Sequence, residues 1–369
     1  MTTSETGSPA PLETSETPSL SRRGALGLAG MGLGAAAFGA ARAVAQAPVA
    51  PLPPTPPNLA RDIRGELQPL APNVYAYIQR EAPGQSNLSV SNCGVVVGDK
   101  ANLAIDATSA PAHAKRFLEA SRRVTGNGFD RCVITHMHGD HTLGLQFLGD
   151  NVECVAQEEC AIAMSLAGSG RPGTWDPKNP AWSDGTETFI KPLADVTYSE
   201  RMTLFGYKPR QVQFLWPQRS HTLGDTNVYL PDEKVIFIGD NGFFGVTPMN
   251  GSGYIARWIK VCDEILAMDV KSIVPGHGPV GGKAELEDMK QYLVLLYTEV
   301  KARFDRGIPP GVAAAEINLG KYSTWADSDR ILLNTVRLYS ELAGTISASV
   351  PPTAVPTART DYNRVKGIK

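Results

Sequence analysis

The sequence predicts an α/β fold, in which strands and helices alternate within one folded domain. Three observations support this class. Residues 101–135 read as a strand, an amphipathic helix and a second strand, which together form a β-α-β unit. Short apolar or alternating strands precede and follow this unit. Three of the six histidines come directly after its second strand, and α/β folds place their ligand sites at such strand ends.

The composition fits a globular protein. Hydrophobic residues make up 42% and charged residues 20% of the 369 residues, and the formal net charge is −2. Binding to a polyanion needs a concentrated basic face, and the sequence has no block of Lys or Arg. We therefore expect no nucleic-acid partner. The composition leaves the oligomeric state open.

The five cysteines do not indicate a disulfide framework, because their number is odd and no C-x-x-C pair occurs. Cys132 and Cys262 lie in apolar runs and are expected to be buried core residues. The spacing of Cys154 and Cys160 leaves a pairing between them open.

The N-terminal segment indicates export. Arg22 and Arg23 precede a mildly apolar run at residues 25–41, and an A-x-A cleavage pattern follows at residues 43–45. Residues 1–45 therefore read as a signal peptide of the twin-arginine type. We expect a periplasmic or extracellular protein that meets the membrane only transiently during export, unless the apolar run is kept as an anchor.

Composition also divides the rest of the chain. Residues 46–62 form a proline-rich linker that cannot pack. The folded domain is expected at residues 63–344. The tail at residues 345–369 is rich in Ser, Pro and Thr and is expected to be disordered.

The first half of the domain reads as a β-meander followed by the β-α-β unit. Apolar or alternating runs bounded by turn residues predict strands at residues 74–78, 91–98, 101–106 and 131–135. Helical spacing and an early proline predict a helix at residues 110–124. His113 falls on its exposed face in this prediction. Residues 143–148 read as short helix or coil.

The second half reads as further strands and four helices. Strands are predicted at residues 152–155, 207–216, 227–230, 234–238 and 271–274, and the third and fourth form a hairpin. Helices are predicted at residues 158–167, 254–268, 284–306 and 328–342.

Residues 135–142 read T-H-M-H-G-D-H-T and place three imidazoles and one carboxylate within six residues. His136 and His138 are two residues apart at a strand end, so their rings can turn toward one ion. Asp140 and His141 follow after Gly139 and can serve a second ion. Zinc binds histidine nitrogen and carboxylate oxygen at about 2.0–2.2 Å, so this pattern indicates a metal site.

Three more candidate ligands stand at later strand ends. His221, Asp240 and His277 each lie close to an apolar strand and in a segment that contains glycine, which lets the backbone approach the centre closely. Taken alone, Asp240 and His277 read as ordinary turn residues. Together with the four residues of the cluster, the three predict two metal sites. His113 is the comparison residue, since it is expected at the surface.

These segments resemble the successive metal motifs of the metallo-β-lactamase superfamily, and the resemblance covers residues 69–304. The motifs occur in order, as T-H-M-H-G-D-H at 135–141, S-H-T-L-G-D at 220–225, I-G-D at 238–240 and P-G-H-G at 275–278. The resemblance implies an αββα sandwich with a dinuclear site at one edge of the sheets. It implies two Zn²⁺ ions, with Fe or Mn as alternatives.

The resemblance also implies a role for each candidate ligand. The first metal would be bound by His136, His138 and His221. The second metal would be bound by Asp140, His141 and His277, and Asp240 would bridge the two.

The ligand set is similar to that of glyoxalase II-like and lactonase-like hydrolases, because the chain has both His141 and Asp240. One class of β-lactamases in the superfamily carries a cysteine at the position of Asp240 and lacks the histidine at His141. Another class lacks the bridging acid. We therefore expect at most weak β-lactamase activity. The nuclease branches are disfavoured because the sequence has no basic patch.

The expected reaction is hydrolysis at a carbonyl group in an ester, lactone, thioester or amide. Two cations that share one water lower its pKa toward neutrality and supply a hydroxide nucleophile. Asp140 would orient this nucleophile and shuttle its proton. Two alternatives stay open: an iron-dependent oxidoreductase of the sulfur dioxygenase type, and an exported binding protein whose metal is structural.

The substrate side of the site is predicted from aromatic residues. Residues 168–188 form a loop of a length that is usually functional or disordered, and they include Trp175 and Trp182. Phe243 and Phe244 follow the I-G-D motif. These four residues are candidates for an apolar substrate wall, although ordinary packing would explain them equally well.

Overall fold

The computed structural model of the chain describes residues 64–80, 91–167, 183, 185–207 and 210–368. The expected signal peptide and linker lie outside the described residues, as do Trp175 and Trp182. Within the described ranges, every helix is too short or too polar to cross a membrane.

The first sheet contains seven strands among the described residues, in the order β1-β2-β3-β4-β5-β6-β7. Their bounds are β1 (Arg64–Ala71), β2 (Val74–Arg80), β3 (Cys93–Val97), β4 (Asn102–Ile105), β5 (Arg131–Val133), β6 (Glu153–Gln157) and β7 (Val196–Tyr198). Neighbouring strands from β1 to β4 are antiparallel, and those from β4 to β7 are parallel. The parallel half includes the predicted β-α-β unit. The strands β1 and β7 were not predicted.

The second sheet contains five strands within the same described ranges, in the order β12-β11-β10-β9-β8. Their bounds are β8 (Arg201–Tyr207), β9 (Arg210–Leu215), β10 (Asn227–Leu230), β11 (Val235–Phe243) and β12 (Ser272–His277). The pair β11 and β12 is parallel, and the other pairs are antiparallel. The strand β8 was not predicted, and Tyr207 ends β8 rather than beginning the next strand.

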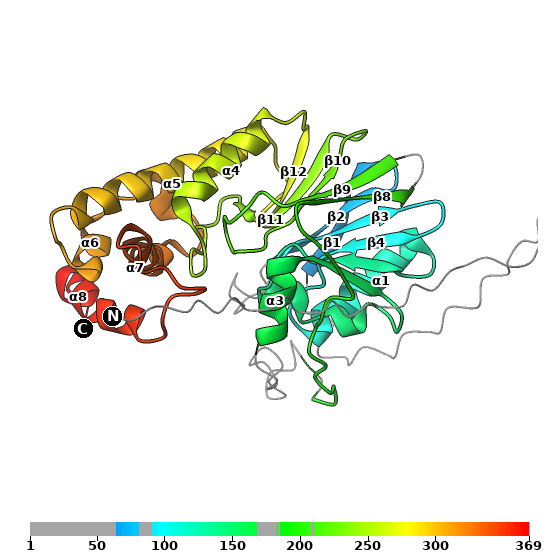
Figure 1. Cartoon of the computed structure of the whole chain (residues 1–369), viewed down its shortest axis with the longest axis horizontal. Coiled ribbons are helices and arrows are strands. Elements are labelled where there is room, and N and C mark those ends of the chain that lie inside the picture. The colour runs from blue at the N-terminus through cyan, green and yellow to red at the C-terminus, as the bar shows by residue number, and fades with distance from the viewer. Residues whose placement is uncertain (1–63, 81–90, 168–182, 184, 208–209, 369) are drawn as a thin grey trace, which may run out of the picture. The chain divides into compact units, whose positions relative to one another are not determined.

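Helices cover the outer faces of both sheets (Figure 1). On the first sheet, α1 (Pro111–Thr125) and α3 (Glu158–Leu166) pack over a core that contains Phe117, Cys132 and Met164. On the second sheet, α4 (Ile255–Ala267) and α5 (Lys283–Phe304) pack over a core that contains Trp258 and Leu293. The order of layers is therefore helix, sheet, sheet, helix, and the predicted αββα sandwich is confirmed.

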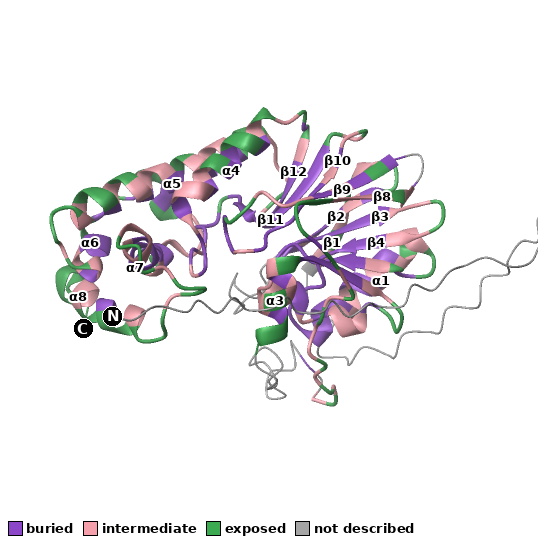
Figure 2. Ribbon diagram, in the orientation of Figure 1, coloured by how far each residue is buried: buried purple, intermediate pink, exposed green. Residues whose placement is uncertain are grey.

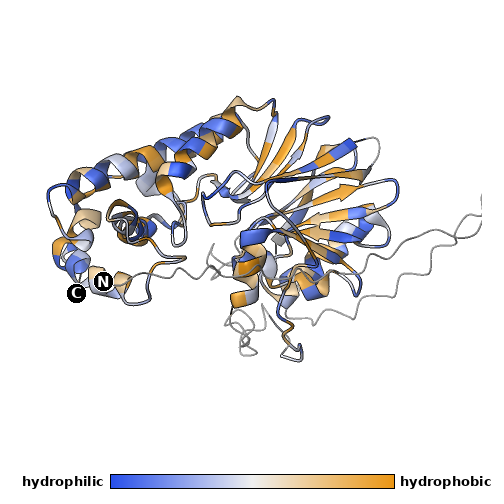
Figure 3. Cartoon of the chain, in the orientation of Figure 1, coloured by the Kyte–Doolittle hydropathy of each residue, from blue (hydrophilic) through white to orange (hydrophobic). Residues whose placement is uncertain are grey.

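The two sheets face each other across a third apolar core. This core joins Val96 and Val133 of the first sheet to Val228 and Phe237 of the second sheet, and all four side chains are buried. Buried and apolar residues are concentrated on the strands in Figures 2 and 3. Burial of apolar area stabilises such a sandwich by about 25 cal/mol per Å². The packed core also holds in place the strand ends that carry polar residues.

The chain after the second sheet contains more ordered structure than the composition predicts. The elements are α6 (Pro310–Glu316), η4 (Gly320–Thr324), η5 (Ser328–Arg330), α7 (Ile331–Leu342) and α8 (Ala354–Lys366). The prediction of a disordered tail at residues 345–369 therefore differs from the structure. Ala358 of α8 packs against Ala314 of α6. A Cβ on Gly311 would lie 2.0 Å from the Ala358 carbonyl oxygen, so only glycine fits there. Small residues make this close contact, so hydropathy alone does not reveal it.

His113 is fully buried, which corrects the prediction that it lies at the surface. Its Nδ1 lies 3.2 Å from Ser109 Oγ. The segment around Glu187 lies next to this end of α1, since Lys115 Nζ is 2.8 Å from Glu187 Oε1. The folded chain therefore buries a face of α1 that helical periodicity predicts to be exposed.

The cysteines agree with the absence of a disulfide framework. All five are free and buried. Cys132 and Cys262 belong to the cores beneath the helices, as predicted. Cys154 and Cys160 do not pair.

Candidate metal centre

The seven candidate ligands come from four places in the fold. Thr135 to His138 follow β5, and His138 precedes the short helix α2 (Gly139–Thr142), which carries Asp140 and His141. The other three ligands come from the second sheet: His221 from the connection between β9 and β10, Asp240 from β11 and His277 from the end of β12. The structure brings all seven side chains together as two groups that share Asp240.

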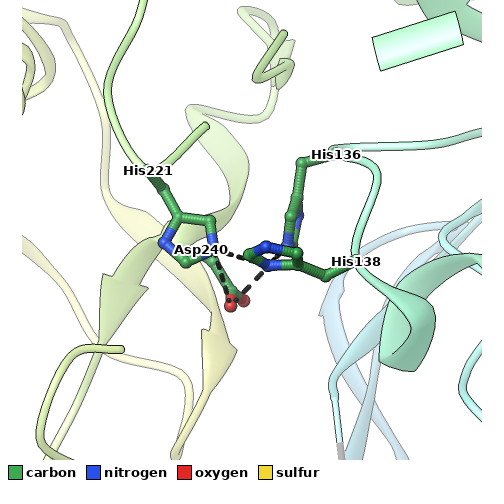
Figure 4. A group of neighbouring side chains, drawn as sticks. All are labelled: His136, His138, His221 and Asp240. Atoms are coloured by element: carbon green, nitrogen blue, oxygen red, sulfur yellow. Dashed lines mark hydrogen bonds and ion pairs between the residues drawn. The ribbon is translucent and has the colours of Figure 1, made fainter. Parts of the chain in front are cut away.

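The first group consists of His136, His138, His221 and Asp240 (Figure 4). His138 Nδ1 lies 3.1 Å from His136 Nε2 and 3.0 Å from His221 Nε2. Asp240 Oδ2 lies 3.7 Å from His136 Nε2 and 3.3 Å from His221 Nε2. Three ring nitrogens and one carboxylate oxygen therefore point toward a common centre.

The second group consists of Asp140, His141, His277 and Asp240. Asp140 Oδ2 lies 3.4 Å from His141 Nε2 and 3.1 Å from His277 Nε2. Asp240 Oδ1 lies 3.0 Å from His141 Nε2 and 3.4 Å from His277 Nε2. The two oxygens of Asp240 are thus divided between the two groups.

These separations fit the binding of a cation. Four ligand atoms at about 2.1 Å from one ion in a tetrahedron lie about 3.4 Å from one another, close to the distances in both groups. His141 Nε2 and Asp240 Oδ1 are buried and make no hydrogen bond of normal geometry among the described residues. A divalent cation would satisfy both atoms, since neutral imidazole and carboxylate are its ordinary ligands.

Asp240 reaches the centre through an irregular part of its sheet. It was predicted to follow its strand, but β11 continues to Phe243. The pairing of β11 with β12 shifts register on both sides of Gly239, whose φ is +48°, and such irregularities redirect side chains. A Cβ on Gly276 would lie 1.9 Å from Asp240 Oδ1. Glycine at position 276 therefore leaves the space that this carboxylate occupies.

The imidazoles of the first group favour the neutral form. Burial lowers the pKa of His136 well below its ordinary value and also lowers the pKa of His138. Burial lowers the pKa of His221 to about 3, although the Asp240 carboxylate acts in the opposite direction. Neutral imidazole is the form that binds a metal.

In the second group, the carboxylates favour the protonated, positively charged form of the two imidazoles. Burial acts to lower the pKa of His141, but Asp140, Asp240 and Asp106 outweigh it and raise that pKa well above its ordinary value. The pKa of His277 rises to about 9 because Asp240 and Asp140 again outweigh burial. Burial acts to raise the pKa of Asp140 and of Asp240, yet the imidazoles hold both pKa values well below the ordinary value. The electrostatics of this group are therefore suited to a cation.

Asp106 is a residue of the centre that the sequence analysis missed. It follows β4, with a φ of +63°, and is buried. Thr135 Oγ1 donates to Asp106 and lies 3.2 Å from His136 Nδ1, while His141 Nδ1 is 2.7 Å from Asp106 Oδ2. Such contacts orient metal-binding imidazoles. Asp106 stands at the end of a predicted strand, and this is the same sequence pattern that identified Asp240 as a candidate ligand.

The predicted aromatic wall is not formed by Phe243 and Phe244. Both side chains are buried in the core beneath α4 and α5, because β11 extends through Phe243. The Phe243 ring stacks on His277 at 4.9 Å between centroids, and the Trp258 ring lies 5.2 Å from that of His221. These aromatic rings support the imidazoles from the core side.

The chain is similar to known families and proteins. The sequence model of the metallo-beta-lactamase superfamily matches residues 87–277. Among curated proteins, the alpha subunit of 2,4-dinitroanisole O-demethylase from Nocardioides sp. (strain JS1661) is 25% identical over 189 residues, covering 49% of this chain and 51% of that protein. The chain thus spans about half the length of this curated relative.

Two solved structures are similar to this chain, and the first of them, with the higher TM-score, shares its fold. The sec-alkylsulfatase Pisa1 from Pseudomonas sp. is 16% identical, with a TM-score of 0.56 over 76% of this chain and 50% of that one. A metallo-beta-lactamase from Pontibacter korlensis is 20% identical, with a TM-score of 0.47 over 62% of this chain and 99% of that one.

Proposed function

Because the chain belongs to the metallo-beta-lactamase superfamily, we propose that it is a metal-dependent hydrolase that binds two divalent cations. Members of this superfamily are mostly metal-dependent hydrolases. The observation that carries the proposal is the division of the seven ligands into two groups that share Asp240. His136, His138 and His221 would hold one cation, and Asp140, His141 and His277 the other.

The residues of the centre have distinct tasks in this proposal. When bound, the cations would polarise the substrate and lower the pKa of a shared water. Asp240 would bind both cations, because each of its two carboxylate oxygens faces one group. The side chain of Asp140 is 13% exposed, whereas that of Asp240 is 4% exposed. Asp140 is therefore the more accessible of the two carboxylates, and its lowered pKa keeps it ionised.

We propose Zn²⁺ as the cation in both positions. Five imidazoles and two carboxylates offer nitrogen and oxygen donors, which suit zinc. Iron and manganese bind the same donors, and iron would accompany the alternative activity of a sulfur dioxygenase type. Metal analysis of the purified chain distinguishes these cases.

The substrate that we propose is a small molecule with an ester, lactone, thioester or amide carbonyl. The ligand set with both His141 and Asp240 supports this class through its resemblance to glyoxalase II-like and lactonase-like hydrolases. A second candidate substrate is an activated aryl methyl ether. It is favoured by the similarity to a protein named for O-demethylation of 2,4-dinitroanisole.

The test combines metal analysis with a substrate panel. We expect about two equivalents of zinc and turnover of at least one lactone, thioester or ester, with phosphodiesters and β-lactams turned over weakly or not at all. Release of 2,4-dinitrophenol from 2,4-dinitroanisole would instead support the second candidate. Bound iron with uptake of O2 in the presence of a persulfide substrate, and no hydrolysis, would overturn the proposal in favour of an oxidoreductase.

Export by the twin-arginine route is a separate proposal, supported by Arg22, Arg23 and the apolar run that follows them. Replacing both arginines with lysine in the full chain should retain the protein in the cytoplasm. Equal export of the variant and the unmodified chain, measured by cell fractionation, would contradict this route.

A further inference from the structure

One face of α7 holds the segment that links β11 to α4. Four polar residues, spaced by four, three and four positions, lie on that face, as i, i+4 and i+7 positions of a helix do. They are Arg330, which immediately precedes α7, and Asn334, Arg337 and Glu341. We refer to these four residues as the α7 clamp. The first three side chains are buried, and Glu341 is partly buried.

The first half of the α7 clamp binds the start of the linking segment. Arg330 Nη1 donates to the Thr247 carbonyl at 2.6 Å. Asn334 Nδ2 donates to the Pro248 carbonyl at 2.8 Å, and Asn334 Oδ1 accepts from the backbone of Asn250 at 2.9 Å. These contacts fix the backbone directly after β11.

The second half of the α7 clamp binds the end of the segment. Arg337 Nη2 and Nε donate to the carbonyls of Ser252 and Gly253, at 2.9 and 2.8 Å. The carboxylate of Glu341 accepts the first two backbone amides of α4, from Ile255 at 2.8 Å and Ala256 at 3.1 Å. Ser252 is thus held between two anchored stretches of backbone.

Ser252 in turn contacts the first metal group. Its Oγ lies 3.3 Å from His138 Nε2. His138 differs from its partners, because it turns Nδ1 toward the common centre while His136 and His221 turn Nε2. A proton on His138 Nε2 would donate to Ser252 Oγ and leave the Nδ1 lone pair for a cation.

We propose that Ser252 is a positioning residue for His138, and that the α7 clamp sets the position of Ser252. The inference rests on the proposed metal binding at the first group. It extends the centre to a helix that provides no ligand, and it assigns a task to the buried guanidinium of Arg337. That task is to fix the backbone of the residue whose hydroxyl orients His138.

The first test measures binding of Co²⁺ to the full chain, by competition with a chelator and by the visible absorption of the bound ion. Ser252→Ala should weaken binding of one Co²⁺ equivalent by about 10- to 100-fold and change the absorption band of that equivalent. Ser121→Ala is the matched control, because Ser121 is also buried but its Oγ donates to the Phe117 carbonyl within α1. The control should bind Co²⁺ as the unmodified chain does.

The second test examines the α7 clamp. Arg337→Lys should weaken the same Co²⁺ equivalent by about 10-fold, because a lysine ammonium cannot span two carbonyls as a guanidinium does. Arg210→Lys is the matched control: Arg210 is also buried, and its guanidinium donates to the carbonyls of Val97 and Pro72 at 3.0 and 2.8 Å. Loss of stability without a change in Co²⁺ binding is expected for Arg210→Lys. The double variant Ser252→Ala/Arg337→Lys should bind Co²⁺ no more weakly than Ser252→Ala alone.

The outcomes separate this inference from the proposed function. If the unmodified chain binds no divalent cation, the proposed function itself fails. If the unmodified chain binds Co²⁺ and Ser252→Ala leaves both affinity and absorption unchanged, the positioning role alone is overturned. Additive effects of Ser252→Ala and Arg337→Lys would contradict a route from the α7 clamp through Ser252.

Discussion

Asp106 Oδ2 lies 2.7 Å from His141 Nδ1, and both side chains are buried. The Asp106 carboxylate also accepts the backbone amide and the hydroxyl of Thr135, each at 2.7 Å. Three donors therefore converge on one carboxylate at the end of β4. This arrangement directs His141 Nε2 toward the second metal group and ties α2 to the first sheet.

Asp106→Asn should weaken metal binding at the second group by about 10- to 100-fold, because the amide offers one acceptor oxygen where two are used. Asparagine tolerates positive φ, so the backbone at position 106 is not strained by this change. Titration with metal and a competing chelator would show one weakened equivalent, with an unchanged circular dichroism spectrum. Two equivalents of unchanged affinity would contradict the role of Asp106.

Gly276→Ala should reduce metal binding, because the added Cβ would lie 1.9 Å from Asp240 Oδ1 and 2.8 Å from the Gly239 backbone, so that this carboxylate and the adjoining strand must shift. Gly206→Ala is the matched control in β8, since a Cβ at Gly206 meets no atom within 4 Å. We expect at least a tenfold loss of metal affinity in the first variant, about 1.4 kcal/mol, and none in the second. Equal affinities in the two variants would show that the Asp240 carboxylate can shift without cost.

Asp240→Ala should lower metal content at both groups and turnover by about 10³-fold, or ~4 kcal/mol of activation free energy, because each oxygen of Asp240 faces one group. His221→Ala should also remove turnover but reduce binding of one equivalent only. Asp195→Ala is the control, since this carboxylate accepts the Cys154 amide at 2.8 Å away from both groups. Full activity in Asp240→Ala and His221→Ala would rule out a mechanism with two cations.

Local patterns were sufficient for much of the fold and for selecting the seven side chains that the structure brings together. The spacing of Phe117 and Leu118 and the early Pro111 predict α1, and the apolar run before His136 predicts β5. Each candidate ligand is a polar residue beside an apolar strand, and parallel strands end at the same edge of a sheet. The structure brings these residues together, while their role as ligands stays a prediction for the metal analysis.

Other features depend on contacts between segments that are distant in sequence. His113 is buried on a helix face that reads as exposed, and α8 packs on α6 through Ala358 and Ala314. The α7 clamp reads in the sequence as an amphipathic helix with a polar face. That polar face binds backbone carbonyls and amides of the segment that links β11 to α4, and only the fold shows which backbone it meets.

His113 should make the stability of the chain depend on pH. Burial lowers the pKa of His113 in the folded chain to about 4, from an ordinary value of 6.5. Above pH 6.5 the imidazole is neutral in both the folded and the unfolded chain. As the pH falls below 6.5, the unfolded chain takes up this proton and the folded chain does not, so the free energy of unfolding decreases until about pH 4.

The size of the decrease follows from the two pKa values, since each pKa unit corresponds to about 1.4 kcal/mol, giving a total of about 3 kcal/mol. In His113→Asn, the amide can replace Nδ1 opposite Ser109 Oγ without titrating. We expect urea unfolding of the metal-free chain to show a smaller loss of stability between pH 6.5 and 4 in this variant than in the unmodified chain. Taking the difference between the two chains removes the contribution of the other histidines. Parallel pH profiles would show that the buried imidazole gains its proton without a loss of stability.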